Sequence, residues 1–174
     1  MKRDFLRLLK ELDEDELREE LRALYERFPV LREYYKMELS GNTKALLDKY
    51  KKTLRKTFFT GRRNMGRRAR SNSNKVIKDF KAIAIHQKDV VELYFYRVAC
   101  MVEAMEHYDI DSEQFYLSMF KSFTAAAELA QKELMLDTFR PVAEAIVEHF
   151  EGIDYYGGGR DLRTKYWEYF GKED

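Results

Sequence analysis

The chain has 174 residues and a formal net charge of +1 at pH 7, with 45% hydrophobic and 36% charged residues. This length accommodates one ordinary domain, or one domain with a small appendage, and the composition excludes an intrinsically disordered protein. No run approaches the roughly 18 apolar residues of a membrane helix, and the charged N-terminus does not resemble a signal peptide, so we expect a cytoplasmic protein without a membrane partner.

The N-terminal 41 residues predict three short amphipathic helices. Asp13 and Glu16 form a capping box at the start of the second helix, whose apolar stripe continues to Phe28. Pro29 fits the first turn of the third helix, because its missing N–H would have no intrahelical partner there. Gly41 then breaks the chain.

Two further helices flank a basic stretch. Residues 43–59 combine a periodic apolar face, which includes Phe58, with a face of lysines and arginine, and a second amphipathic helix is expected from Val76. Between them, glycine and asparagine interrupt the arginine-rich run GRRNMGRRARSNSNK. We therefore predict a basic loop over residues 61–75.

Residues 88–108 predict a helix that is apolar nearly all round and so belongs in the middle of a bundle. Asp89 and Glu92 form a capping box at its start. The main polar exceptions along it are Glu92, Arg97, Glu103 and Glu106. Cys100, the only cysteine, lies in its apolar run, and we expect a buried small hydrophobe there rather than a nucleophile.

Two more helices and an aromatic tail follow. Asp111 with Gln114 predicts the cap of the first helix, and Asp137 opens the second, with Pro141 in its first turn and Gly152 at its end. The elements together predict an all-α fold: a single-domain helical bundle of about eight helices with a central hydrophobic helix. We place the bundle at residues 1–152, and a hinge (Gly157–Gly159) with a short aromatic helix at residues 153–174.

Four runs, ALYERFPVLREYY, LLDKYKKTLRKTFF, KVIKDFKAI and HYDIDSEQFYLSMFKSFTAAAEL, resemble in this order an all-helical bacterial family of unknown function. The resemblance covers residues 1–150, approximately, and implies the fold but no activity, since these runs are helix-packing patterns without a catalytic signature. Family members resemble this chain in placing a basic, variable stretch between the TFF and KVIKDF helices.

The small net charge conceals a bipolar distribution. Residues 44–81 contain fourteen basic and two acidic residues, a net charge of +12, which leaves −11 for the remainder. Arginine suits phosphate, because its guanidinium carries a planar fork of donors. We therefore expect non-specific contact with nucleic acid or another polyanion through nine residues: Arg62, Arg63, Arg67, Arg68, Arg70, Lys51, Lys52, Arg55 and Lys56.

The alternative is a helical protein-protein adaptor or a self-associating protein without a nucleic-acid role. The basic segment would then be solvated, or would pair with acidic residues of the same or a neighbouring molecule. Tail aromatics such as Tyr166, Trp167 and Phe170 would supply an interface.

The sequence predicts no enzyme, metal site or cofactor. His86, His107 and His149 lack the Glu-x-x-His spacing of a di-iron bundle and the H-E-x-x-H motif of a zinc helix. The run YYGGGRD lacks the lysine and hydroxyl residue of a phosphate loop. We therefore expect a non-enzymatic binding protein.

Overall fold

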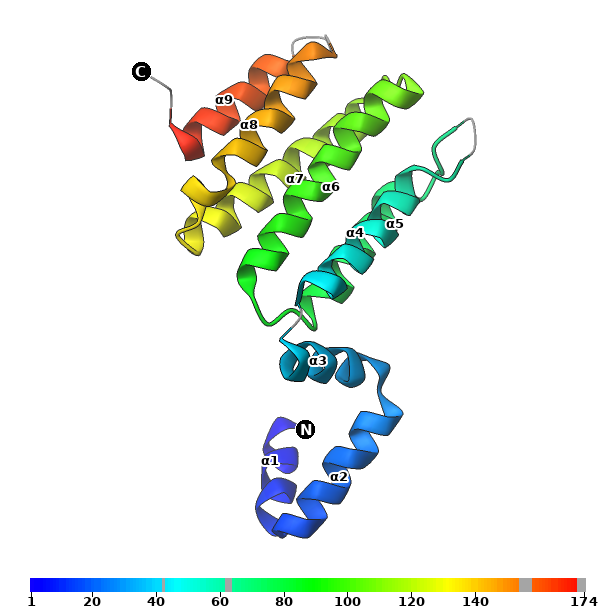
Figure 1. Ribbon diagram of the computed structural model, residues 1–174, viewed down its shortest axis with the longest axis vertical. Coiled ribbons are helices and arrows are strands. Elements are labelled where there is room, and N and C mark those ends of the chain that lie inside the picture. The colour runs from blue at the N-terminus through cyan, green and yellow to red at the C-terminus, as the bar shows by residue number, and fades with distance from the viewer. Residues whose placement is uncertain (42, 62–63, 154–157, 172–174) are drawn as a thin grey trace. The chain divides into compact units, whose positions relative to one another are not determined.

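The computed structural model describes residues 1–41, 43–61, 64–153 and 158–171. Every regular element within these ranges is a helix (Figure 1), so the predicted all-α helical bundle is confirmed. In chain order the helices are α1 (Lys2–Glu11), α2 (Glu14–Arg27), α3 (Pro29–Ser40), α4 (Thr43–Phe58), α5 (Ala69–Lys81), α6 (Gln87–Tyr108), α7 (Glu113–Lys132), α8 (Leu136–Gly152) and α9 (Gly158–Phe170).

The chain forms two compact units, Met1–Gly41 and Asn42–Asp174. In the first unit the predicted capping box is present: Asp13 Oδ1 accepts from the Glu16 N–H, and Glu16 Oε2 accepts from the Asp13 N–H, both at 2.9 Å. Pro29 is the first residue of α3, as expected, and Gly41 ends this helix at a φ of 61°, in the left-handed region that favours glycine.

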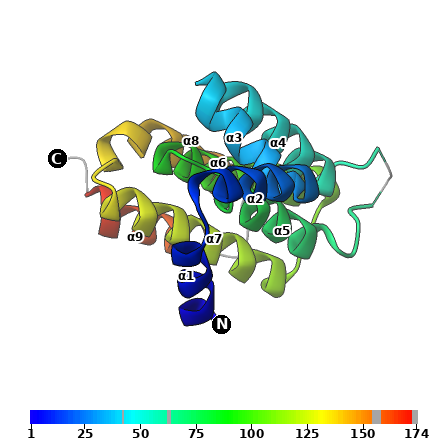
Figure 2. The same cartoon turned by 90° about the horizontal axis from the view of Figure 1, so that it is seen from below.

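The second unit is built around α6. This helix packs against α4, α5, α7 and α8, and Figure 2 shows it among them. Phe95 of α6 is fully buried, and its ring lies 5.9 Å from Phe123 of α7 and 5.6 Å from Phe139 of α8. Cys100 is 1% exposed. The central hydrophobic helix and the buried cysteine are therefore both confirmed.

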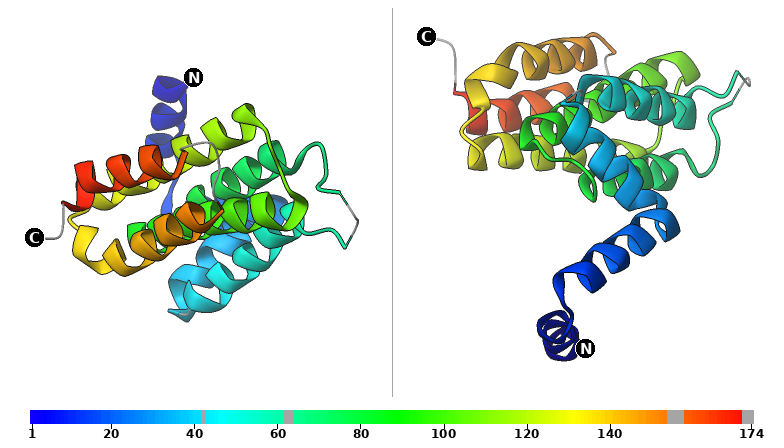
Figure 3. Two further views of the ribbon diagram at one scale, coloured as in Figure 1. Left: turned by 90° about the horizontal axis from the view of Figure 1, so that it is seen from above. Right: turned by 60° about the horizontal axis from the view of Figure 1, so that its bottom comes forward.

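The aromatic helix α9 belongs to this second unit, where it packs against α8 and α7 (Figure 3). Leu162, Tyr166 and Phe170 are buried. Arg163 secures the edge of the helix, since its Nε and Nη2 donate to the two carboxylate oxygens of Glu151 at 3.0 and 2.6 Å. The compact units divide at Gly41, and α9 buries its apolar face within the second of them.

The starts of α6, α7 and α8 differ from expectation. α6 begins at Gln87, so Asp89 lies inside the first turn, where a carboxylate also stabilises the helix dipole. α7 is capped by Ser112, whose hydroxyl accepts from the Phe115 N–H, and not by Asp111. α8 begins at Leu136, which puts Pro141 beyond its first turn. At α7, the neighbours Asp111 and Ser112 offer the same capping chemistry, so the sequence does not rank them. The N-cap residues of α6 and α8, His86 and Met135, make no side-chain cap hydrogen bond.

The predicted basic loop is partly helical, because α5 begins at Ala69. Serine and asparagine in this stretch favour a loop, since their side chains can compete for backbone groups. The hydroxyls of Ser71 and Ser73 instead donate to the carbonyls of Arg68 and Arg70, three residues earlier in the same turn. Of the predicted glycine hinge, Gly157 lies outside the described residues, and Gly158 and Gly159 begin α9.

Candidate anion-binding site

The basic segment lies on the antiparallel pair α4 and α5 (Figure 1). Leu54 and Phe58 of α4 and Phe80 of α5 are fully buried, so these helices use their apolar faces for packing and direct most of their cations outward. The chain reverses between the two helices. The last turn of α4 and the first turn of α5 therefore lie at the same end of the pair.

Two of the nine predicted contact residues are neutralised by acids of α6. Lys51 Nζ lies 2.5 Å from Glu92 Oε1. Arg55 donates from Nη1 and Nη2 to the two oxygens of Glu103, at 2.6 and 2.5 Å. This fork raises the pKa of Arg55 and holds the pKa of Glu103 below its ordinary value. Lys51 and Arg55 thus join α4 to α6.

Four others are exposed: Lys52, Lys56, Arg67 and Arg68. Among the described residues, no carboxylate pairs with any of these four cations. Lys52 and Lys56 are four residues apart and so share one face of α4. Arg62 and Arg63, also predicted, lie outside the described residues.

The first turn of α5 concentrates positive charge. It contains no acid, and the N-cap residue Arg68 makes no side-chain cap hydrogen bond. Arg70, the ninth predicted residue, donates from Nη1 to the backbone carbonyl of Gln114 at 2.8 Å. The N-terminus of a helix carries a partial positive charge of its own, which adds to these guanidinium groups. An anion placed here would be stabilised by both.

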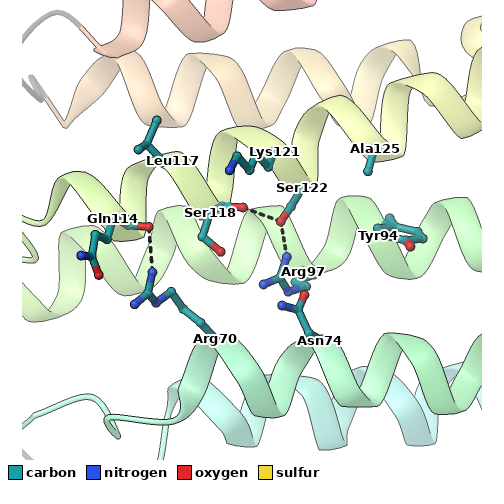
Figure 4. Close-up of a pocket in the computed structure, with 10 residues that line it drawn as sticks. All are labelled: Arg70, Asn74, Tyr94, Arg97, Gln114, Leu117, Ser118, Lys121, Ser122 and Ala125. Carbon is teal, nitrogen blue, oxygen red and sulfur yellow. Dashed lines mark hydrogen bonds between the residues drawn. The ribbon is translucent and has the colours of Figure 1, made fainter.

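A groove of about 550 Å³ lies between α5 and α7, and α6 forms its floor (Figure 4). Arg70 and Asn74 contribute from α5, Tyr94 and Arg97 from α6, and a longer set from α7: Gln114, Leu117, Ser118, Lys121, Ser122 and Ala125. The lining thus contains three cations and no acidic residue.

Arg97 is the buried cation of this groove, and the predicted site does not include it. The sequence marks it only as a polar exception on an apolar helix, in the run YFYRVACMV. An arginine is seldom fully buried without a charged partner. The position of Arg97 in a run expected to be buried was therefore the signal in the sequence that could have marked it as a candidate site residue. The groove itself joins three helices, and no local pattern indicates it.

The histidines form no metal cluster in the part of the chain that the structure describes. His149 Nε2 lies 2.9 Å from Glu106 Oε2, and the His107 ring contacts the ring of Tyr108. Nowhere in the described ranges do three His, Cys, Asp or Glu side chains approach closely enough to hold a metal ion. In the same ranges, no helix combines the length and the apolar character needed to cross a membrane.

Comparison with known proteins gives a family and no activity. A family of unknown function (DUF6155) has a model that matches residues 1–152, close to the range of the resemblance seen in the sequence. No curated protein and no solved structure matches the chain. The matched range includes α4–α7 and therefore both the basic segment and the groove. The chain belongs to this family of unknown function.

Proposed function

We propose that the protein is a non-catalytic binding protein that contacts nucleic acid or another polyanion through exposed cations of residues 44–81. The observation that supports this function is the set Lys52, Lys56, Arg67 and Arg68, exposed and without a carboxylate partner among the described residues. Lys51 and Arg55 are excluded from the contact, since each is paired with a glutamate of α6.

Such a contact is electrostatic and indifferent to base sequence. Each cation that neutralises a phosphate releases a counterion, so the logarithm of affinity falls with the logarithm of salt concentration by about 0.9 per contact on duplex DNA. Four contacts correspond to a slope of about −3.6. Phosphate contacts position a protein on nucleic acid without reading its bases.

The experiment is a fluorescence anisotropy titration of labelled single-stranded and duplex oligonucleotides, at salt concentrations from about 50 to 200 mM. The test variant replaces the four exposed cations by serine. The control variant removes the same charge from four exposed cations elsewhere: Lys10, Arg22, Lys36 and Lys132. We expect the test variant to lose most of the affinity and most of the salt slope, and the control to keep the slope.

Two results would contradict the proposal. One is the absence of binding to either oligonucleotide at the lowest salt. The other is an equal loss in the test and control variants, because affinity would then follow net charge and not a surface formed by α4 and α5.

A second candidate function is self-association, supported by the bipolar charge of +12 over residues 44–81 and −11 elsewhere. Neither α1 nor α2 buries a residue, and Phe5, Leu8 and Leu21 are exposed in the first unit. Light scattering at low and high salt tests it. A mass that falls toward one chain at high salt supports an electrostatic contact between copies, and a single-chain mass at all salt concentrations excludes it.

A further inference from the structure

Arg97 is buried in the floor of the groove between α5 and α7. Its side chain is 2% exposed, which places it among the largest fully buried side chains of the protein. Nε donates to Ser73 Oγ of α5 at 3.0 Å, and Nη1 donates to Ser122 Oγ of α7. The guanidinium therefore lies between the two walls of the groove (Figure 4).

The two serines leave Arg97 incompletely satisfied. Nη2 is buried and has no hydrogen-bond partner. Ser73 and Ser122 use their own hydroxyl hydrogens on the carbonyls of Arg70 and Ser118, so each hydroxyl only accepts from Arg97. Two neutral oxygens thus face a full positive charge, and no carboxylate of the described residues pairs with it.

A buried charge without a counterion is expensive, and proteins normally place a carboxylate beside it. The cost is visible in the pKa of Arg97, which burial lowers to about 10. A structural strut between α5 and α7 would not require an arginine, because an uncharged donor can also bond a serine hydroxyl. A buried guanidinium is instead what a groove requires if it binds an anionic ligand, because the ligand then supplies the missing negative charge.

The rest of the lining also consists mainly of cations and hydrogen-bond donors. Arg70 and Lys121 add two cations near the mouth of the groove, and Asn74 and Gln114 add uncharged amide donors. Asn74 and Lys121 are exposed, so their side chains can move as a ligand enters. Tyr94, Leu117 and Ala125 supply an apolar margin beside these donors. A group with several acceptor oxygens and two negative charges is what this lining complements.

We propose that the groove between α5 and α7 is a binding site for a phosphate monoester, with Arg97 as its buried anchor and Arg70 and Lys121 as outer cations. Phosphate is favoured over a carboxylate, because three cations and two amides exceed what two carboxylate oxygens can accept. The site goes beyond the proposed function and does not depend on it: of its three cations, Arg97 and Lys121 lie outside residues 44–81, and only Arg70 lies within them.

The first test uses inorganic phosphate and the full-length chain, with chloride at matched ionic strength as reference. A site that makes at least two charge-assisted hydrogen bonds binds phosphate with a dissociation constant of about 1 mM. At tenfold excess over that value, the melting temperature rises by about 3–6 °C. Line broadening of the phosphate signal in phosphorus NMR gives the same constant independently.

Lys121→Gln is the main variant, since Lys121 is exposed and its replacement disturbs no buried contact. We expect its phosphate dissociation constant to rise about tenfold. Lys132→Gln is the matched control on the same helix, outside the groove, and keeps the wild-type constant. Arg97→Lys preserves the charge without the fork, and its loss of phosphate binding at unchanged helix content would assign the binding to the guanidinium.

The proposal is overturned if phosphate shows no saturable binding up to about 10 mM, or if Lys121→Gln and Arg97→Lys bind it like the wild type.

A second experiment asks which kind of molecule carries the phosphate, and it uses two oligonucleotides of one sequence, with and without a 5′-phosphate. A 5′-phosphate preference that Lys121→Gln abolishes assigns the site to a nucleic-acid end, and equal affinities assign it to a small phosphorylated molecule. Failure of oligonucleotide binding refutes the proposed function and leaves the inorganic-phosphate result unaffected.

Discussion

Replacing Glu103 by alanine tests whether ion pairing inside the chain decides which cations reach a polyanion. Arg55 is held by both oxygens of Glu103, and its guanidinium lies 4.5 Å from the centre of the Phe59 ring. We expect this ring contact to remain in Glu103→Ala. The variant therefore leaves Arg55 in place and removes only its counter-charge, so that the Arg55 guanidinium becomes available to a phosphate of the oligonucleotide.

The expected gain in affinity follows from counterion release. Four exposed cations correspond to a salt slope of about −3.6, and Arg55 as a fifth contact makes it about −4.5. By the same relation, one added contact that contributes nothing at 1 M salt raises the affinity at 0.1 M salt by up to about eightfold. Glu103→Ala should therefore bind an oligonucleotide more tightly than the wild type and respond to salt more steeply.

The same substitution lowers stability modestly. The Arg55 and Glu103 side chains are 44% and 39% exposed, so solvent screens the pair and its loss costs about 1 kcal/mol. The folded-state pKa of Glu103 lies below its ordinary value, so this stabilisation is present above the unfolded-state pKa of about 4.3 and is lost as pH falls through the folded-state pKa. Urea unfolding should show a larger difference between wild type and variant at pH 7 than at pH 3.

The assay is the anisotropy titration with duplex oligonucleotide, together with urea unfolding. Glu148→Ala is the control, because it changes net charge equally and Glu148 is an exposed residue without a cation partner among the described residues. Unchanged affinity in Glu103→Ala would refute the reasoning, because Arg55 would then add no contact to the oligonucleotide. An equal gain in Glu148→Ala would also refute it, because the affinity would then follow net charge alone.

Two further predictions concern the second unit. Arg163→Met should destabilise the protein by about 2 kcal/mol and speed amide hydrogen exchange in α9, because it leaves Glu144 and Glu151 without their guanidinium partner; unchanged exchange in α9 would contradict this. Native Cys100 should react with iodoacetamide at pH 8 at least about a hundredfold more slowly than the urea-unfolded chain, since burial raises its pKa to about 11. Similar native and unfolded labelling rates would show that the thiol is accessible.

Local sequence patterns were sufficient to predict the helices, apart from the starts of α5, α6, α7 and α8. The capping box of Asp13 and Glu16, the first-turn position of Pro29 and the left-handed Gly41 are each decided within a few residues, and all three are present. The central place of α6 followed from the same kind of information, because a helix apolar on every side is stable only when other helices surround it. The basic charge of residues 44–81 is likewise a property of composition alone.

Which charges remain available was decided by the tertiary structure. Lys51 and Lys52 are neighbours in sequence, but only Lys51 faces a glutamate, which lies 41 residues further along the chain. Arg97 and the serines that contact it come from three helices, 24 and 25 residues from it in the chain. Composition determines how many charges a chain carries, whereas the desolvation and pairing of each depend on side chains that only packing brings within a few ångströms.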